Sequence, residues 1–254
     1  MACAWAFLSG KGGTGKSTVA LCAAVGLARA GQKVALVDAD AGVRNLDMML
    51  GMENKIVFDL LDVIEGEATL DQALGPVKGT PGLSLLCASQ VRDPSEMTGD
   101  ALCALLGSLR ERFDQVVVDC PTGIGAIVQA IMSCVDEAVI VTTPDDIALR
   151  DADRAAGLVS QRGGARARVV VNRVRPEYVK RGLQYAPEAV AATLDAKLLG
   201  AVPEDEEIRR AALERRMPGE GEGGRALASL ALAMLGRPAQ ETQRRRLFPR
   251  LSPS

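Results

Sequence analysis

The segment Ser9-Gly10-Lys11-Gly12-Gly13-Thr14-Gly15-Lys16-Ser17-Thr18 fits the pattern G-x-x-x-x-G-K-[ST]. An apolar run at 4–8 precedes it, and a helix-like run at 19–25 follows it. Glycine lets the backbone approach a phosphate closely, and successive N–H groups at a helix N-terminus then point at the anion. The segment therefore predicts a strand, a phosphate-binding loop (P-loop) and a helix, with Lys16 on the β- and γ-phosphates and Ser17 on Mg²⁺.

A second lysine, Lys11, lies inside the same loop, although Lys16 already occupies the usual phosphate position. We hypothesise that Lys11 crosses the interface of a symmetric dimer and contacts the nucleotide of the partner, as an arginine finger does in trans. The alternative is an exposed charge without that role. Under the first interpretation the loop is half of a shared site, and the active species is a dimer.

The chain has 254 residues, a formal net charge of −2 and a sequence pI of about 5.4. It has room for one large α/β domain or at most two small ones, and it carries no global basic field that would attract nucleic acid. It contains no histidine, which excludes catalysis by imidazole. Its six cysteines form no C-x-x-C pair and lie mostly in apolar runs. We expect buried free thiols, as in a reducing cytoplasm.

Short continuous apolar runs alternate with helical patterns along the chain. Such runs are typical of parallel strands that are covered on both faces. We predict an α/β fold: a doubly wound, mostly parallel sheet with helices on both faces. Residues 1–236 are expected to form a single domain, followed by a basic tail at 237–254. The predicted strands lie at 4–8, 34–37, 83–87, 116–118, 138–141, 169–171 and 198–202.

Ligands of an open parallel sheet bind at the carboxyl ends of its strands. Asp119 ends the apolar run at 116–118, which is the form of a Walker B strand, and is predicted to hold Mg²⁺ directly or through water. Asp40 follows the second strand and is predicted to orient the attacking water or to join the Mg²⁺ shell. Asp38 is expected to be structural or to lie in the outer shell of the Mg²⁺ ion. The alternative for each carboxylate is ordinary turn or strand-end chemistry.

Together these residues resemble the deviant Walker A ATPases of the ParA/MinD family, whose loop pattern K-G-G-x-G-K-[ST]-T the P-loop matches. The segments 38–47, 119–124 and 150–154 carry the likeness, and 201–205 adds to it. The likeness covers roughly residues 1–236. The segment Arg44-Asn45-Leu46-Asp47 points to the division-site and flagellar-number branches of the family rather than to plasmid partition.

The resemblance implies ATP and Mg²⁺ as cofactors, an ATP-dependent homodimer, and slow hydrolysis that a partner stimulates. It implies catalytic roles for Lys11, Lys16 and Asp40. Ser17, Asp40 and Asp119 are implied to hold the metal. Residues 10–18, Asn172, Pro203, Glu204 and Asp205 are implied to bind the nucleotide. Within this set, Asn172 and the loop at 203–205 match the positions that surround the adenine base in the family. The residues implied to dock partners are Arg44, Asn45, Arg150, Asp151 and Asp153.

The resemblance further implies a cytoplasmic protein that lies on the inner face of the cell membrane in its ATP state. There it would position the division site by recruiting a MinC-like division inhibitor, and a MinE-like or other topological factor would stimulate it. The apolar residues Leu247, Phe248 and Leu251 stand among arginines, which suits an anionic membrane surface. Pro249 disfavours a continuous helix there, and a disordered basic tail is the alternative.

Other functions remain open at this point. One is a ParA-type ATPase that partitions DNA or cargo, although the acidic pI makes nucleic acid an unlikely partner. Another is a flagellar-number regulator of the same branch. A third is an iron–sulfur ATPase on the same fold, for which Cys87 and Cys120 are the candidate ligands.

Overall fold

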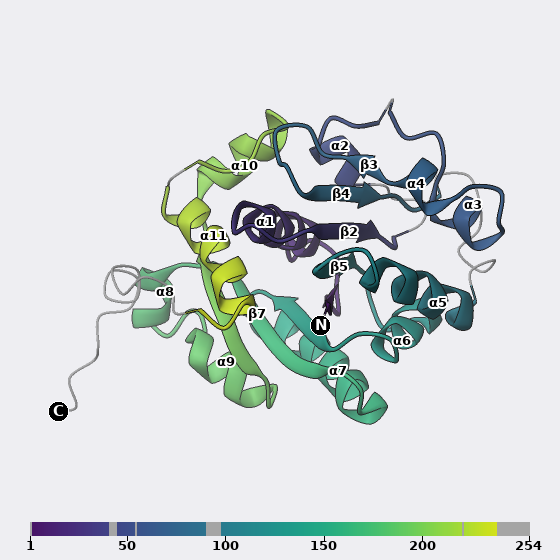
Figure 1. Ribbon diagram of the computed structural model, residues 1–254. Helices are drawn as coiled ribbons and strands as arrows, with labels where there is room; N and C mark the ends of the chain where they lie inside the picture. The colour runs from purple at the N-terminus through teal and green to yellow at the C-terminus, as the bar shows by residue number, and fades with distance from the viewer. Residues whose placement is uncertain (1, 41–44, 54, 90–97, 220, 238–254) are drawn as a thin grey trace.

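The computed structural model of the protein describes residues 2–40, 45–53, 55–89, 98–219 and 221–237. Its centre is an eight-stranded sheet in the order β3-β4-β2-β5-β1-β6-β7-β8 (Figure 1). The strands are β1 (Cys3–Leu8), β2 (Val34–Asp38), β3 (Gly75–Pro76), β4 (Leu83–Leu86), β5 (Gln115–Asp119), β6 (Glu137–Thr142), β7 (Arg166–Val174) and β8 (Lys197–Pro203). All neighbours pair in parallel except β3 and β4. The predicted strands are confirmed, and the two-residue β3 was not predicted.

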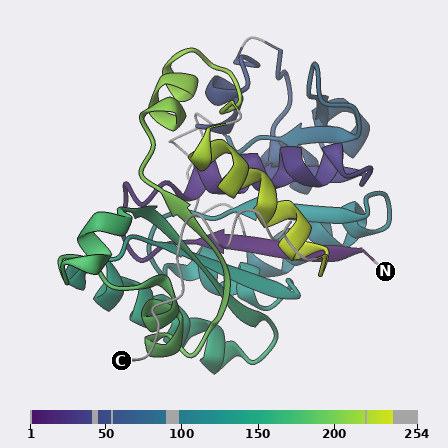
Figure 2. The same cartoon turned by 90° about the vertical axis from the view of Figure 1, so that its left-hand side faces the viewer.

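Helices cover both faces of this sheet. They are α1 (Lys16–Arg29), α2 (Leu46–Met49), α3 (Leu60–Ile64), α4 (Leu70–Ala73), α5 (Gly99–Arg110), α6 (Ala126–Met132), α7 (Asp146–Arg162), α8 (Pro176–Lys180), α9 (Pro187–Thr193), α10 (Glu206–Leu213) and α11 (Glu222–Met234). Figure 2 shows α11, in yellow, crossing one face of the sheet beside α1, in purple. The predicted fold class is confirmed.

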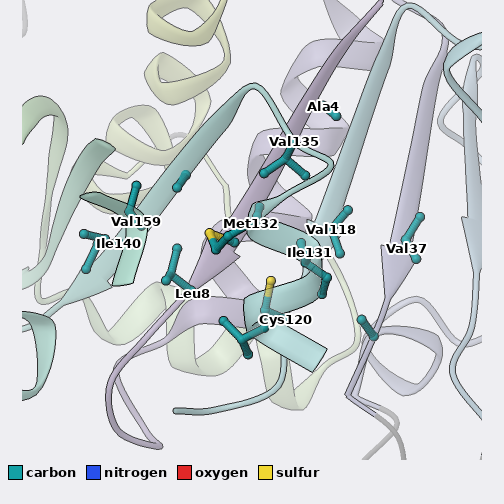
Figure 3. Close-up of a cluster of buried hydrophobic side chains, with 14 of the residues drawn as sticks. Ala4, Leu8, Val37, Val118, Cys120, Ile131, Met132, Val135, Ile140 and Val159 are labelled. Atoms are coloured by element: carbon teal, nitrogen blue, oxygen red, sulfur yellow. The ribbon is translucent and has the colours of Figure 1, made fainter. Parts of the chain in front are cut away.

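Side chains of one strand alternate between two cores, because successive Cβ atoms point to opposite faces. In β1, Trp5 and Phe7 pack with α1 and α11, whereas Leu8 packs with α5, α6 and α7. Figure 3 shows Leu8 in this second core with Met132 and Ile140. The strands are therefore buried on both sides, which explains why their sequences read as unbroken apolar runs. Within the described ranges, no helix is long and apolar enough to cross a membrane.

Buried polar contacts close the amino edge of the sheet. The indole Nε1 of Trp5 donates to Gln115 Oε1 at 2.9 Å. Glu137 is buried and accepts from Arg168 at 2.7 and 3.1 Å, and Arg166 lies 2.5 Å from its carboxylate. These buried polar groups satisfy one another's hydrogen-bonding capacity, so this edge of the sheet has a structural role. The carboxyl edge is therefore the one that we expect to bind ligands.

One cysteine pair corrects the expectation of six free thiols. Cys103 of α5 and Cys134, two residues after α6, form a disulfide with a Cα–Cα distance of 5.4 Å. Both residues are half-buried, one on α5 and one just past the end of α6, so the fold and not the sequence spacing brings them together. Cys22, Cys87 and Cys120 carry no disulfide and are buried, as expected, whereas Cys3 carries no disulfide and is half-buried. Burial raises the pKa of the Cys22 thiol to about 12, which makes that thiol unreactive.

A single carboxylate, that of Asp205, caps two helices. Its Oδ1 accepts from the N–H of Glu207 in α10, and its Oδ2 accepts from the N–H of Gly223 in α11, both at 2.9 Å. A Cβ on Gly223 would lie 2.8 Å from the Asp205 Cβ, so the close approach requires glycine there. This shared cap fixes how the loop after β8 meets α11.

Replacing Asp205 with alanine removes both caps at once. We expect Asp205→Ala to lower the free energy of unfolding by about 1–3 kcal/mol, since one N-cap contributes about 0.5–2 kcal/mol. Urea denaturation without nucleotide measures the change. Glu206→Ala is the matched control, because Glu206 is exposed in the same turn and is expected to change the value by less than about 0.5 kcal/mol. Equal effects of the two substitutions would contradict the shared cap.

Candidate functional site

The P-loop connects β1 to α1 at the carboxyl edge of the sheet. Gly13 and Gly15 have φ angles of 80° and 90°, which L residues with side chains rarely adopt. A Cβ on Gly10 would lie 2.2 Å from the carbonyl oxygen of Asp151 in α7, and one on Gly15 would lie 2.3 Å from Nδ2 of Asn172 in β7. Two of the glycines are therefore fixed by close packing, so the loop is held between α7 and β7.

A buried ion pair lies beneath this loop. Lys16 Nζ is 2.6 Å from Asp119 Oδ1, and the two residues are 6% and 1% exposed. Ser17, the next residue of α1, lies close enough to the Asp119 carboxylate to lower the pKa of that group. Burial raises the pKa of Asp119 above its usual range, and the charge of Lys16 opposes that rise. The structure thus brings Lys16, which is predicted to bind phosphate, close to Ser17 and Asp119, which are predicted to bind Mg²⁺.

Two more carboxylates lie beside the pair. Asp38 stands opposite Asp119 in the register of β2 and β5, and it accepts from the N–H groups of Asp40 and Leu46 at 3.0 and 3.4 Å. Burial and the charge of Asp119 raise the pKa of Asp38 to about 7. Asp40 is half-buried, and desolvation raises its pKa also. Asp38 therefore positions the chain that carries Asp40, and Asp40 faces the same charges.

The residues present fit an Mg²⁺-bound nucleotide. Oxygen donors of Ser17, Asp40 and Asp119 are the hard ligands that Mg²⁺ prefers. Among the described residues, no group of three or more Asp, Glu, Cys or His side chains forms a complete metal cage. Proteins usually hold Mg²⁺ with one or two carboxylates together with substrate phosphates, and the two carboxylates and one hydroxyl here are donors of that kind. Within the same described part, the buried Thr14 Oγ1 has no hydrogen-bond partner, which marks the loop as built for a further polar group.

Lys11 lies at the rim of the site. Its Nζ is 3.4 Å from Oδ1 of Asp145, and their side chains are 33% and 48% exposed. Asp145 is the N-cap of α7 and accepts from the N–H of Ala148. The sequence analysis did not identify Asp145, although an aspartate directly before a helix is a capping signal. Lys11 is thus separate from the Lys16–Asp119 pair and reaches toward α7.

The residues predicted around the base also lie at this edge. Asn172 Nδ2 donates to the Thr14 carbonyl at 2.7 Å. Pro203 ends β8, and the N–H of Glu204 donates to the carbonyl of Val174 in β7 at 3.0 Å. The Glu204 carboxylate accepts from Arg175 and Arg209, and Asp205 is the double cap described above. The loop after β8 is consequently rigid and lies against the end of β7.

The residues predicted to dock partners differ in their exposure to solvent. Arg150 and Asp153 are exposed on α7. Asp151 is half-buried, and its carbonyl oxygen abuts the P-loop at Gly10. Asn45 precedes α2, and Arg44 lies outside the described residues.

A surface hollow of about 430 Å³ lies between α6 and α7. Ile124, which is 42% exposed, belongs to the segment between β5 and α6 and lines this hollow with Leu158. The hollow is also lined by Gln129, Asp153, Arg154 and Arg162. The hollow therefore combines apolar and charged side chains, and it lies directly beside the segment that follows Asp119.

Comparisons with known proteins agree with this site. A family model described as "ParA: NUBPL iron-transfer P-loop NTPase" matches residues 3–222. The putative septum site-determining protein MinD of Nephroselmis olivacea is 42% identical over 201 residues, which are 79% of this chain and 73% of that protein. The chain belongs to the MinD family of septum site-determining ATPases. The resemblance inferred from the P-loop and the strand ends is confirmed.

Solved MinD-family structures share the whole fold. MinD in the MinC:MinD cell division complex of Aquifex aeolicus superposes with a TM-score of 0.83 at 33% identity, over 93% of this chain and 97% of that one. MinD of Pyrococcus horikoshii, solved with Mg-ADP, gives a TM-score of 0.81 at 30% identity, over 92% and 96%. The P-loop, Asp119 and the β7–β8 edge thus lie within a fold that carries a magnesium nucleotide in a relative.

The iron–sulfur interpretation finds no support in the placement of the cysteines. Cys87 and Cys120 are both fully buried, and they belong to the cores on opposite faces of the sheet. Burial raises the pKa of the Cys120 thiol, which disfavours the thiolate that a cluster requires. The side chains of these two residues therefore serve to pack the hydrophobic cores.

The buried ion pair gives a test of the site without nucleotide. Removing one partner leaves a buried charge alone, so we expect Lys16→Met and Asp119→Asn each to lower the free energy of unfolding by about 3–5 kcal/mol. The double variant should lose less than the sum, with a coupling of about 0.5–3 kcal/mol. Urea denaturation of the three variants measures this coupling. Strict additivity would show that the two charges do not interact in solution.

Proposed function

We propose that this chain is an Mg²⁺-dependent ATPase that dimerises on binding ATP, associates reversibly with a membrane surface and positions the division site by recruiting a division inhibitor. The observation that carries the proposal is the convergence of the P-loop, Asp40 and the buried Lys16–Asp119 pair at one edge of the sheet, in a chain of the MinD family. Its slow basal hydrolysis is stimulated by a second protein.

The hydrolytic step follows from the positions of these groups. The N–H groups of the P-loop and Lys16 would bind the phosphates, while Ser17, Asp119 and Asp40 would hold the cation. When bound there, Mg²⁺ would supply positive charge that offsets the negative charge developing on the phosphate oxygens. Asp40 is half-buried beside the pair and orients the attacking water. Since phosphoryl transfer depends on positioning and charge, no strong general base is required.

The rim position of Lys11 supports a shared site. Its contact with Asp145 is exposed on both sides, and ion pairs of this kind contribute about 0–1 kcal/mol. Lys11 therefore leaves Asp145 at little cost and reaches the nucleotide of a second copy. In that position it stabilises the charge of the transition state, as an arginine finger does.

The hollow between α6 and α7 is the proposed docking site for the inhibitor and for the stimulating factor. It combines the apolar groups of Ile124 and Leu158 with the charges of Asp153 and Arg154. The same helix, α7, touches the P-loop through the carbonyl oxygen of Asp151. A partner bound in the hollow consequently acts on the phosphate site through one rigid element.

The membrane step rests on the tail, whose residues Leu247, Phe248 and Leu251 lie outside the described residues. Each basic residue near an anionic surface contributes about 1 kcal/mol, so a single tail binds weakly. Two tails on one dimer bind far more tightly through their effective concentration. The protein is therefore proposed to be cytoplasmic with ADP and peripheral on the inner face of the cell membrane with ATP.

The role of Lys11 is tested by the oligomeric state. We expect Lys11→Ala to stay monomeric with Mg-ATP and to hydrolyse ATP about 10-fold more slowly or worse, because the trans contact is lost. Light scattering with and without Mg-ATP and a phosphate-release assay measure both. Lys78→Ala, which changes an exposed lysine in a distant turn, should behave as wild type. A Lys11→Ala protein that dimerises and hydrolyses normally would falsify the shared site.

The membrane step is tested by sedimentation with vesicles of anionic lipid. We expect the full chain to pellet with Mg-ATP and to remain mostly in solution with Mg-ADP, because only the dimer presents two tails. A chain that ends at Gly236 should remain in solution with either nucleotide. Equal pelleting of the full and shortened chains would show that the tail does not anchor the protein.

A further inference from the structure

The strand β7 carries an irregularity next to the phosphate site. Val171 pairs with Ala201 and Val174 pairs with Pro203, so two residues of β7, Asn172 and Arg173, stand opposite one residue of β8. Arg173 has a φ angle of 58°, in the left-handed region that is uncommon for residues other than glycine. An extra residue of this kind bends a strand and re-aims a side chain, and it is common beside active sites.

The side chain that this bulge re-aims is that of Asn172, and both ends of its amide are used. Nδ2 donates to the carbonyl of Thr14 at 2.7 Å, and Oδ1 accepts from the N–H of Arg173 at 3.0 Å. The residue is buried, and its Nδ2 fills the space that a Cβ on Gly15 would occupy. One amide therefore ties the bulge of β7 to the P-loop.

A second amide supports the bulge from its outer side. Gln184 Oε1 accepts from the N–H of Arg175 at 2.7 Å, and its Nε2 donates to the carbonyl of Arg173 at 3.2 Å. These two bonds satisfy backbone groups at the point where the register with β8 shifts. The contacts form a continuous chain from Gln184 through the bulge and Asn172 to Thr14.

The peptide unit between Thr14 and Gly15 explains how this series of hydrogen bonds affects the phosphate site. The carbonyl of Thr14 and the N–H of Gly15 belong to the same planar trans peptide, so they point in opposite directions. A bond that holds the Thr14 oxygen toward β7 therefore turns the Gly15 N–H away from β7. Gly15 directly precedes α1, where backbone N–H groups bind phosphate.

We propose that Asn172 is a positioning residue of the phosphate site, which braces the Thr14 carbonyl so that the Gly15 N–H faces the phosphates, and that Gln184 supports it through the bulge. The inference rests on the proposed nucleotide-binding function. It differs from the base contact that the family resemblance implies for Asn172, because bracing acts on the phosphates and is independent of the base.

A ligand without a base separates the two roles. Mg-tripolyphosphate and Mg-ATP are each used to displace a fluorescent ADP analogue from wild type, Asn172→Ala and Gln184→Ala. We expect Asn172→Ala to weaken both ligands by the same factor, about 5- to 10-fold, because a net hydrogen bond is lost. Gln184→Ala should weaken both by about 2- to 5-fold. Gln161→Ala, an exposed amide on α7, is the control and should change neither.

The outcomes are distinct. Loss of Mg-ATP affinity with unchanged tripolyphosphate affinity would mean that Asn172 contacts only the base and would overturn the inference, as would full affinity for both ligands. Thermal melting of each variant shows that it is folded, and if Asn172→Ala does not fold, the partly exposed Gln184→Ala decides by the same comparison. Failure of the wild type to bind Mg-ATP would instead refute the proposed function.

Discussion

The buried pair of Lys16 and Asp119 is the interaction on which the rest of the site depends. It joins the first turn of α1 to the end of β5, two segments that are 103 residues apart in the chain. Neither charge is tolerated alone in this core, because an unpaired buried ion loses its hydration without compensation. The pair thereby fixes the P-loop over the strand that carries the proposed metal ligand, and every other group of the site takes its position relative to it.

Sequence reasoning was strongest where function depends on local spacing. The P-loop needs a strand before it and a helix after it, and Asp119 needs an apolar run before it, so both could be recognised within a few residues. Sequence reasoning did not find the contacts that join segments far apart in the chain. The bond from Asn172 to the Thr14 carbonyl spans 158 residues, and the Cys103–Cys134 bridge depends on how α5 meets α6. The roles of Asp145 and Gln184 likewise depend on partners that only the fold supplies.

The helix α7 connects parts of the molecule that otherwise have separate tasks. Its N-cap, Asp145, holds Lys11, and its second turn presses a carbonyl oxygen against Gly10 of the P-loop. Farther along, Leu158 and Arg162 line the hollow beside α6. A packed helix moves as a unit because its backbone bonds resist local bending. In the proposed function, the nucleotide, the second copy and the partner protein all contact α7, so binding of one is expected to affect the binding of the others.

The contact between Trp5 and Gln115 has a practical consequence. Trp5 is the only tryptophan of the chain, it is 4% exposed, and its indole N–H is bonded within the sheet. About 17 Å of extended chain separates it from the first glycine of the P-loop. We therefore expect its intrinsic fluorescence to report whether the sheet is intact and to change little when a ligand occupies the phosphate site. The molecule carries its own optical probe of unfolding, and ligand loading has to be followed with a separate label.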